Sequence, residues 1–380
     1  MDVRQLTLEA NDTFNLRAEV LSEINPQFVL IFASPGQGDL AELSRAVAQR
    51  FPGAVVAGCT TAGEISSAGV SDQSAVITAI RFSTGTPRLA QTRLADIDDS
   101  DAAGQRLGTQ LKDSACSAVM LFGQGVGING SAVVGGLAAQ LPAGTPIVGG
   151  LAGDDGAFKA TQVICGDTVS NDTLVAVALP KGVTIGHGSF GGWKPFGPAR
   201  KVTRSQANVL YELDGEPALA VYKRYLGDHA NGLPASGLLF PFEMLDSDHG
   251  SVGLIRTILG IDESNGSLTL AGDIVKDGHL RLMHASNDAL IDGAEAAADA
   301  AAGMMGGKTS NFCLLVSCIG RKLVMGKRTE EEIEAVSAVF GKNAVLAGFY
   351  SYGEISPFLN TTECRLHNQT MTITSLSENV

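Results

Sequence analysis

The sequence predicts an α/β protein in which repeated strand-helix-strand-strand units form mixed sheets with flanking helices, in two packed domains. The first observation is a motif that occurs twice, because residues 54–66 and 344–356 share the frame A-V-[VL]-A-G-x-x-[TS]-x-G-E-I-S. A weaker copy spans residues 146–154. The second observation is that an apolar run and a segment with helical spacing precede each copy. We name the copies the N-terminal motif (54–66), the middle motif (146–154) and the C-terminal motif (344–356).

The first unit shows how each element is predicted. Residues 28–33 are a continuous apolar run, which is typical of a strand buried on both faces. Residues 39–50 carry apolar side chains at helical spacing, and Pro52-Gly53 ends that helix. The N-terminal motif then supplies a second strand, and residues 75–82 supply a third.

The same unit returns twice along the chain. A helical connection between two strands is the length that a parallel pair requires, so the first two strands of each unit are predicted to be parallel. The strand that follows each motif is predicted to return antiparallel. The middle unit comprises strands at 118–123, 146–150 and 173–179 and a helix at 129–141; the last comprises strands at 312–317, 344–348 and 369–376 and a helix at 329–340.

A different region separates the second and third units. Residues 183–195 are rich in glycine and hold the only Trp, and residues 202–227 predict a strand, an Asp-Gly turn and a helix that opens at Pro217. Further strands and an Ala-rich helix are predicted at 251–260, 267–271, 279–284 and 287–302. We place the domain boundary near residue 210, which gives an N-terminal domain of residues 1–210 and a C-terminal domain of residues 211–380.

The composition argues against several classes of function. The net charge of −13 disfavours binding to a phosphate backbone or an anionic membrane, and an aromatic content of 6% disfavours base stacking. The chain has no basic segment followed by an apolar run at its start and no stretch of about 18 apolar residues. The six cysteines are scattered, which favours a cytoplasmic protein with reduced thiols.

Several motifs in this order resemble those of the FIST family, a pair of linked domains found in bacterial sensory proteins. Residues 57–65 resemble the hallmark of its N-terminal domain. Four segments resemble the hallmarks of its C-terminal domain, namely residues 211–218, 317–321, 348–355 and 366–370. The resemblance covers nearly the whole chain, and it implies a cytoplasmic ligand-sensing protein that acts with signalling partners.

The resemblance also implies a cofactor and a partner. Stand-alone members of the family include haem-binding nitric oxide sensors that regulate histidine kinases, and this chain carries no output segment, so it resembles that type. We therefore expect haem b as a cofactor and a histidine kinase or another signalling protein as a partner, with a homodimer as one expectation. The alternative is a sensor of a small metabolite such as an amino acid, without haem.

The strand ends of the two strong motifs are the predicted ligand-binding rim. A glycine turn precedes a carboxylate in each, and facing strand ends are expected to leave a hollow for a small molecule. The alternative is architectural, with the carboxylate capping a turn or pairing with an arginine. The predicted ligand-binding residues are Cys59, Thr60, Thr61, Glu64, Tyr350, Ser351, Tyr352, Glu354, His367 and Asn368.

Two arginines are predicted to bind a cofactor or to form a buried pair. Arg256 interrupts an apolar strand and Arg321 follows one, so each guanidinium needs an anion. That anion could be a ligand carboxylate such as a haem propionate, or it could be a protein carboxylate from Glu64, Glu354 or Asp273.

His187 is the predicted metal-binding and cofactor-binding residue. It lies between glycines in an otherwise apolar strand, where an imidazole could be an axial ligand of haem iron. Its alternative role is that of a core histidine bonded to the backbone. Catalysis finds little support, because no nucleophile, metalloprotease or phosphate-loop motif is present. An acid–base pair of Glu64 and Glu354 is the one enzymatic hypothesis, and we expect a protein that is not an enzyme.

Overall fold

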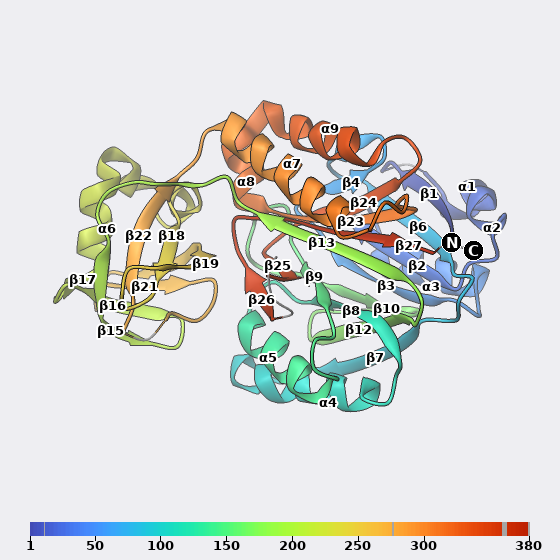
Figure 1. The fold of residues 1–380 in the computed structure, drawn as a ribbon, viewed down its shortest axis with the longest axis horizontal. Coiled ribbons are helices and arrows are strands. Elements are labelled where there is room, and N and C mark those ends of the chain that lie inside the picture. Colours follow the sequence, from blue (N-terminus) through green and yellow to red (C-terminus); the bar gives the residue numbers. More distant parts are fainter. Residues whose placement is uncertain (11, 276, 359–362, 379–380) are drawn as a thin grey trace.

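The computed structural model describes residues 1–10, 12–275, 277–358 and 363–378, which form two lobes (Figure 1). The larger lobe, here the body, comprises residues 1–190 and 287–378. The smaller one, here the β-lobe, comprises residues 194–284 and stands apart at the left of Figure 1. Strands and helices alternate along the body, so the predicted α/β class with mixed sheets is confirmed.

The body contains three six-stranded sheets, each built around one of the predicted units. Sheet 1 has the order β1-β6-β2-β3-β10-β11, sheet 2 the order β26-β25-β9-β8-β12-β7, and sheet 3 the order β13-β27-β23-β24-β4-β5. In each sheet the first two strands of the unit are parallel and its last strand is antiparallel, as predicted.

The first unit runs from β1 to β6. Its elements are β1 (Asp2–Leu8), α1 (Phe14–Arg17), α2 (Glu19–Ser22), β2 (Phe28–Ala33), α3 (Leu40–Arg50), β3 (Val55–Thr60), β4 (Glu64–Ser66), β5 (Gly69–Ser71) and β6 (Ala75–Arg81). The second unit contains β7 (Arg88–Arg93), α4 (Ser100–Leu111), β8 (Cys116–Gly123), α5 (Gly130–Gln140), β9 (Ile147–Leu151), β10 (Val163–Cys165), β11 (Thr168–Ser170) and β12 (Thr173–Pro180).

The third unit is interrupted by the β-lobe. It begins with β13 (Thr184–Phe190) and resumes with α7 (Asn287–Gly303), β23 (Phe312–Cys318), α8 (Ile319–Met325), α9 (Thr329–Phe340), β24 (Val345–Ser351), β25 (Gly353–Pro357), β26 (Cys364–His367) and β27 (Met371–Ser377). The strand β13 is an addition to the unit predicted from sequence, and it pairs antiparallel with the last strand, β27.

Each unit gives its short hairpin to the sheet of another unit. The hairpin β4–β5 of the first unit pairs with β24 of the third, and β25–β26 of the third pairs with β9 of the second. The hairpin β10–β11 of the second unit pairs with β3 of the first, which closes the cycle. No unit can therefore complete its own sheet, and the three form one interlocked body.

Three phenylalanines mark the centre of that body. Phe32, Phe122 and Phe349 come from β2, β8 and β24, and their ring centroids lie 4.7 to 6.4 Å apart. All three side chains are fully buried. The inner faces of the three sheets thus share one apolar core, while helices cover the outer faces: α1 to α3 on sheet 1, α4 and α5 on sheet 2, and α7 and α9 on sheet 3.

A glycine in each motif permits close packing between the paired parallel strands. A Cβ on Gly58, Gly149 or Gly348 would lie 1.7 to 2.2 Å from a backbone carbonyl oxygen of the neighbouring strand. Gly58 and Gly149 also have positive φ, of 156° and 128°. Backbone geometry therefore requires one glycine at this position of each motif.

The β-lobe is a nine-stranded antiparallel sheet with one longer helix, α6 (Ala218–Leu226). Its strands are β14 (Lys194–Pro195), β15 (Arg200–Gln206), β16 (Val209–Leu213), β17 (Glu216–Pro217), β18 (Phe242–Leu245), β19 (Ser251–Arg256), β20 (Ile258–Asp262), β21 (Ser267–Leu270) and β22 (His279–His284). A division at residue 210 falls within β16, which pairs with β15 on its N-terminal side. None of the described helices has the length and apolarity needed to cross a membrane.

Candidate functional site

The N-terminal and C-terminal motifs meet, but as neighbouring strands. Residues 64–66 pair with residues 347–349, and the Ala62 N–H donates to the Tyr350 carbonyl at 2.9 Å. In return, the Tyr350 N–H donates to the Gly63 carbonyl. The prediction of a hollow between the two motifs is therefore wrong, because backbone hydrogen bonds join the motifs directly.

The two repeated carboxylates have the same bonding pattern. Glu64 accepts hydrogen bonds from the Thr61 hydroxyl and from the N–H and hydroxyl of Ser74, at 3.1 and 2.8 Å for the latter two. Glu354 accepts them from the Ser351 hydroxyl at 2.8 Å and from the N–H and hydroxyl of Thr370, at 3.1 and 2.9 Å.

Both carboxyls are fully buried, and burial raises the pKa of Glu64 to about 7 and that of Glu354 to about 8, although the hydrogen bonds lower both. The residues before Ser74 and Thr370, Gln73 and Gln369, both have positive φ. The two copies thus form the same turn, and each carboxylate ties its hairpin to the start of the last strand of its unit. This bonding matches the architectural alternative.

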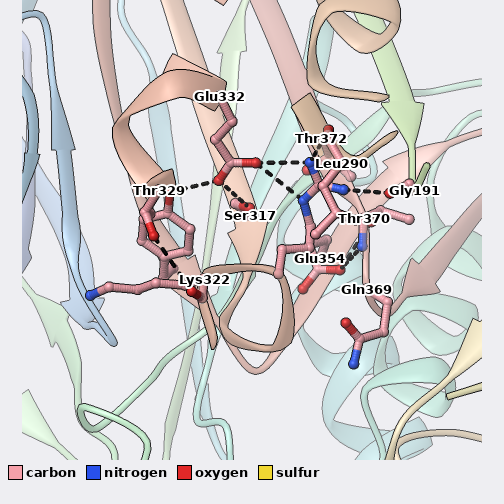
Figure 2. Close-up of polar contacts among 12 residues, drawn as sticks. Gly191, Leu290, Ser317, Lys322, Thr329, Glu332, Glu354, Gln369, Thr370 and Thr372 are labelled. Atoms are coloured by element: carbon pink, nitrogen blue, oxygen red, sulfur yellow. Dashed lines mark hydrogen bonds and ion pairs between the residues drawn. The ribbon is translucent and has the colours of Figure 1, made fainter. Parts of the chain in front are cut away.

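Arg321 is bonded to protein groups on several sides, and Figure 2 labels three of them, Glu332, Gly191 and Leu290. Its Nε and Nη2 donate to the Glu332 carboxylate at 3.2 and 2.8 Å, and its Nη1 and Nη2 donate to the carbonyls of Gly191 and Leu290. Both side chains of the ion pair are fully buried. Glu332, on α9, also accepts hydrogen bonds from Ser317 and Tyr350. The anion that Arg321 needs is supplied by a residue that sequence reasoning did not single out.

Arg256 is also buried and bonded to the protein. Its Nε donates to the Asp273 carbonyl at 3.2 Å, and its Nη1 donates to the carbonyls of Ile255 and Leu366. Burial lowers its pKa to about 10, and the nearby Asp273 charge partly offsets that effect. The contact with Leu366 joins the β-lobe to the body, so this guanidinium lies at the interface of the lobes.

Some features of the surroundings of His187 favour haem binding, and others argue against it. Its Nδ1 is buried and has no hydrogen-bond partner among the described residues, which suits an axial ligand. Burial lowers its pKa, which favours the neutral imidazole. However, His187 lines neither of the two cavities described below. Neither of these cavities therefore offers a haem a position beside this imidazole.

The next three predicted residues, each in a different environment, are Cys59, Thr60 and Tyr352. Cys59 is fully buried, and burial raises its pKa well above the ordinary value, so it is a neutral thiol. Thr60 bonds the backbone of Gln162, and the Tyr352 hydroxyl bonds Asp154 while its ring stacks on Phe158 at 4.1 Å.

The last two predicted residues lie in or next to the turn that precedes β27. The His367 Nε2 lies 3.0 Å from the Ser356 carbonyl oxygen, and both amide atoms of Asn368 are buried without a partner in the described residues. His367 also lines the cavity described next.

A cavity of about 370 Å³, here the lobe cavity, lies between the β-lobe and the body. Strands β18, β19 and β22 of the β-lobe form one wall, and the segment after β13 and the ends of β25 and β26 form the other. Its lining is largely apolar, which is typical of a small-molecule site. The apolar side chains are Phe190, Trp193, Leu254, Ile255, Met283 and Phe358, and the polar ones are Ser189, Glu243, Ser251, His367 and Thr370.

The lobe cavity has one ionised side chain in its lining. Glu243 pairs with Arg281, whose Nε and Nη2 both donate to Oε2, at 3.1 and 2.6 Å. The second histidine candidate, His367, is neutral near pH 7 because burial lowers its pKa to about 4. Sequence reasoning missed Glu243 and Phe358, since only the docking of the β-lobe on the body brings these two residues to one cavity. The lone Trp among glycines was the available signal.

A second cavity of about 440 Å³ lies beside the N-terminal motif. It is lined by Ala62, Asp72, Gln73, Asp155, Ile319, Lys322, Leu323 and Gly326. Lys322 donates to the Ala62 carbonyl and pairs with Asp72, so its charge is already matched. This space is more polar and its walls are more exposed than those of the lobe cavity.

Comparison with known proteins assigns both halves of the chain to one family. The model of the FIST N domain matches residues 27–216, and the model of the FIST C domain matches residues 218–357. The chain is also similar to an uncharacterized protein of Methanocaldococcus jannaschii, with 39% identity over 85 residues. That alignment covers 21% of this chain and 15% of the relative, so the chain spans a small part of the relative's length.

Proposed function

Because the chain belongs to the FIST family, we propose that it is a ligand-sensing protein of signal transduction whose small-molecule ligand binds in the lobe cavity. FIST domains are sensory ligand-binding domains and not typical enzyme domains. The observation that carries the proposal is a largely apolar cavity, with a few convergent polar groups, between two lobes joined by short segments.

The interface around the cavity is suited to reporting occupancy. The Trp193 indole donates to the Gln369 carbonyl at 2.7 Å, and the Gln369 amide donates to the Leu238 carbonyl and to Thr257, both at 3.0 Å. These bonds join the β-lobe to the turn before β27. A ligand that contacts both walls would favour one relative position of the lobes, which a partner could read from the exposed surface.

Ligand screening with Trp193 as the reporter tests this proposal. Trp193 is the one Trp of the chain and is 8% exposed on the cavity wall, so its emission should change when a compound binds. A ligand at 100 times its dissociation constant should also raise stability by about 2.7 kcal/mol. The Ser251→Phe variant should lose both responses because it fills the cavity, whereas Thr203→Phe on β15 should keep them. Equal responses in both variants would place the ligand elsewhere.

Haem binding with nitric oxide sensing and control of a histidine kinase is a second proposal. The unpartnered Nδ1 of His187 supports it, but the face of β13 that carries His187 would have to open. Purified protein mixed with haemin should then show a sharp Soret band that shifts with nitric oxide and weakens in His187→Ala. A cytoplasmic location and a homodimer belong to the same proposal, and size-exclusion chromatography checks the latter.

Acid–base catalysis by Glu64 and Glu354 is the least favoured proposal. Both carboxyls are fully buried, and neither lines the lobe cavity or the second cavity, so no substrate reaches them from those cavities in this conformation.

A further inference from the structure

We propose that the ligand of the lobe cavity is an organic cation: an amine with an aromatic or aliphatic body and no carboxylate, whose ammonium group binds Glu243. This inference rests on the proposed ligand site, and it names the chemical class that the site selects.

The walls favour an apolar body that carries a positive charge. Three aromatic side chains, Phe190, Trp193 and Phe358, line a volume of about 370 Å³. Aromatic faces attract ammonium groups in addition to burying apolar surface. A compound the size of an aralkylamine therefore meets complementary surface over both its ring and its charged end.

The single ionised side chain is arranged to accept one more hydrogen bond. Arg281 binds Oε2 of Glu243 through both Nε and Nη2, which leaves Oε1 without a partner among the described residues. The Glu243 side chain is 12% exposed, so the carboxylate is largely withdrawn from solvent. The guanidinium fixes the carboxylate in position, and a charge-assisted bond to Oε1 is stronger here than at a fully solvated site.

A hydroxyl on the opposite wall is also oriented as an acceptor. The Thr370 hydroxyl is hydrogen-bonded to Glu354 at 2.9 Å and lines the cavity, so its oxygen has a lone pair that can accept from an ammonium group. An ammonium group has three donors and no acceptor, which matches Glu243 and Thr370 together.

The cavity offers no side chain that could neutralise an anion. Neither Arg nor Lys is among its lining residues, Arg281 is paired with Glu243, and the buried guanidiniums of Arg256 and Arg321 are bonded to carbonyls and to Glu332. The net charge of −13 also disfavours anions at long range. A carboxylate on the ligand would therefore lose hydration without a cationic partner.

Matched probes that share one ring and differ in the head group test the inference on the unaltered protein. The probes are 2-phenylethylamine, 2-phenylethanol, L-phenylalanine and 3-phenylpropionate, with binding measured by Trp193 emission and by thermal shift. We expect the amine to bind at least tenfold more tightly than 3-phenylpropionate and more tightly than L-phenylalanine. Tighter binding of the propionate or of the amino acid would overturn the inference and leave the cavity as the site.

A charge-removing variant gives a second, independent readout. Glu243→Gln should lower the affinity for 2-phenylethylamine at least tenfold and leave that for 2-phenylethanol unchanged. Glu216→Gln, which removes an exposed carboxylate of the same lobe, should change neither. An unchanged amine affinity in Glu243→Gln would contradict the role of Glu243.

The outcomes separate the inference from the proposed site. If none of the four probes alters Trp193 emission or the melting temperature, both the lobe cavity as a site and its cation selectivity are refuted. Because the head-group series needs no variant, the inference stays testable even if Glu243→Gln does not fold.

Discussion

Single buried charges in this protein are stabilised by specific partners. Arg321 and Glu332 are both fully buried, and the guanidinium also bonds carbonyls from the segment after β13 and from α7. A buried pair of this kind is costly to break because the remaining charge has no solvent. The arrangement fixes α8, α9 and the entry to the β-lobe around one guanidinium.

Removing the charge of Glu332 should therefore destabilise the protein strongly. We expect Glu332→Gln to lower the free energy of unfolding by about 3–5 kcal/mol, measured by urea denaturation. Glu23→Gln is the control, because its pair with Arg4 is about half exposed on both sides and should contribute less than about 1 kcal/mol. Equal losses in the two variants would contradict this reading of the buried pair.

The raised pKa of Glu354 predicts a pH dependence with a defined sign. The folded protein keeps a proton on this carboxyl up to about pH 8, whereas its ordinary pKa is 4.5. This contribution to stability is present below pH 4.5 and is lost as pH rises through 8. The melting temperature should thus fall between pH 5.5 and 8.5, and Glu354→Gln should flatten that fall. Glu64, with a pKa of about 7, acts in the same direction and remains in the variant; parallel curves for the two proteins would refute the assignment.

At the scale of elements, glycines decide how closely helices and strands approach. Two adjacent glycines on α5 make this visible. A Cβ on Gly136 would lie 2.1 Å from the Asp101 carbonyl of α4, whereas a Cβ on Gly135 would meet nothing within 4 Å. The α4–α5 contact therefore requires one of the two glycines and not the other.

This difference gives a matched pair of substitutions. Gly135→Ala should stabilise the protein by about 0.5–1 kcal/mol, since alanine restricts the unfolded chain and favours helix. Gly136→Ala should destabilise it by about 1–3 kcal/mol through overpacking against α4. Urea denaturation of both variants measures the difference, and a stabilising Gly136→Ala would show that α4 and α5 do not pack as described.

At the scale of the whole molecule, the cyclic exchange of hairpins makes the body cooperative. Each sheet holds strands from two units, so none of the three is complete without another. The β-lobe differs, because every described strand of residues 194–284 pairs only within that range.

Isolated fragments of the body and of the β-lobe should therefore differ in their ability to fold. A fragment of residues 1–180 holds two units but lacks the partners of β4 and β9, so we expect it to bind a hydrophobic dye and to lack dispersed amide signals. Residues 194–284 alone should give a cooperative thermal transition. Independent folding of the 1–180 fragment would contradict the interlocking of the units.

The local sequence determined the fold class, the repeated unit and the parallel and antiparallel order within each unit. Those features depend on apolar runs, helical spacing and glycine turns, which act over a few residues. The family resemblance also followed from motifs that stand in order along the chain.

Only the tertiary structure decided which strands complete which sheet, which anion pairs with Arg321, and where a cavity lies. Glu332 is a helix residue like its neighbours in sequence, and Glu243, Trp193 and Phe358 become one lining only when the β-lobe docks beside the turn before β27. The physical reason is that burial and pairing are properties of segments far apart in the chain, and local patterns carry no information on which distant backbone a strand edge will meet.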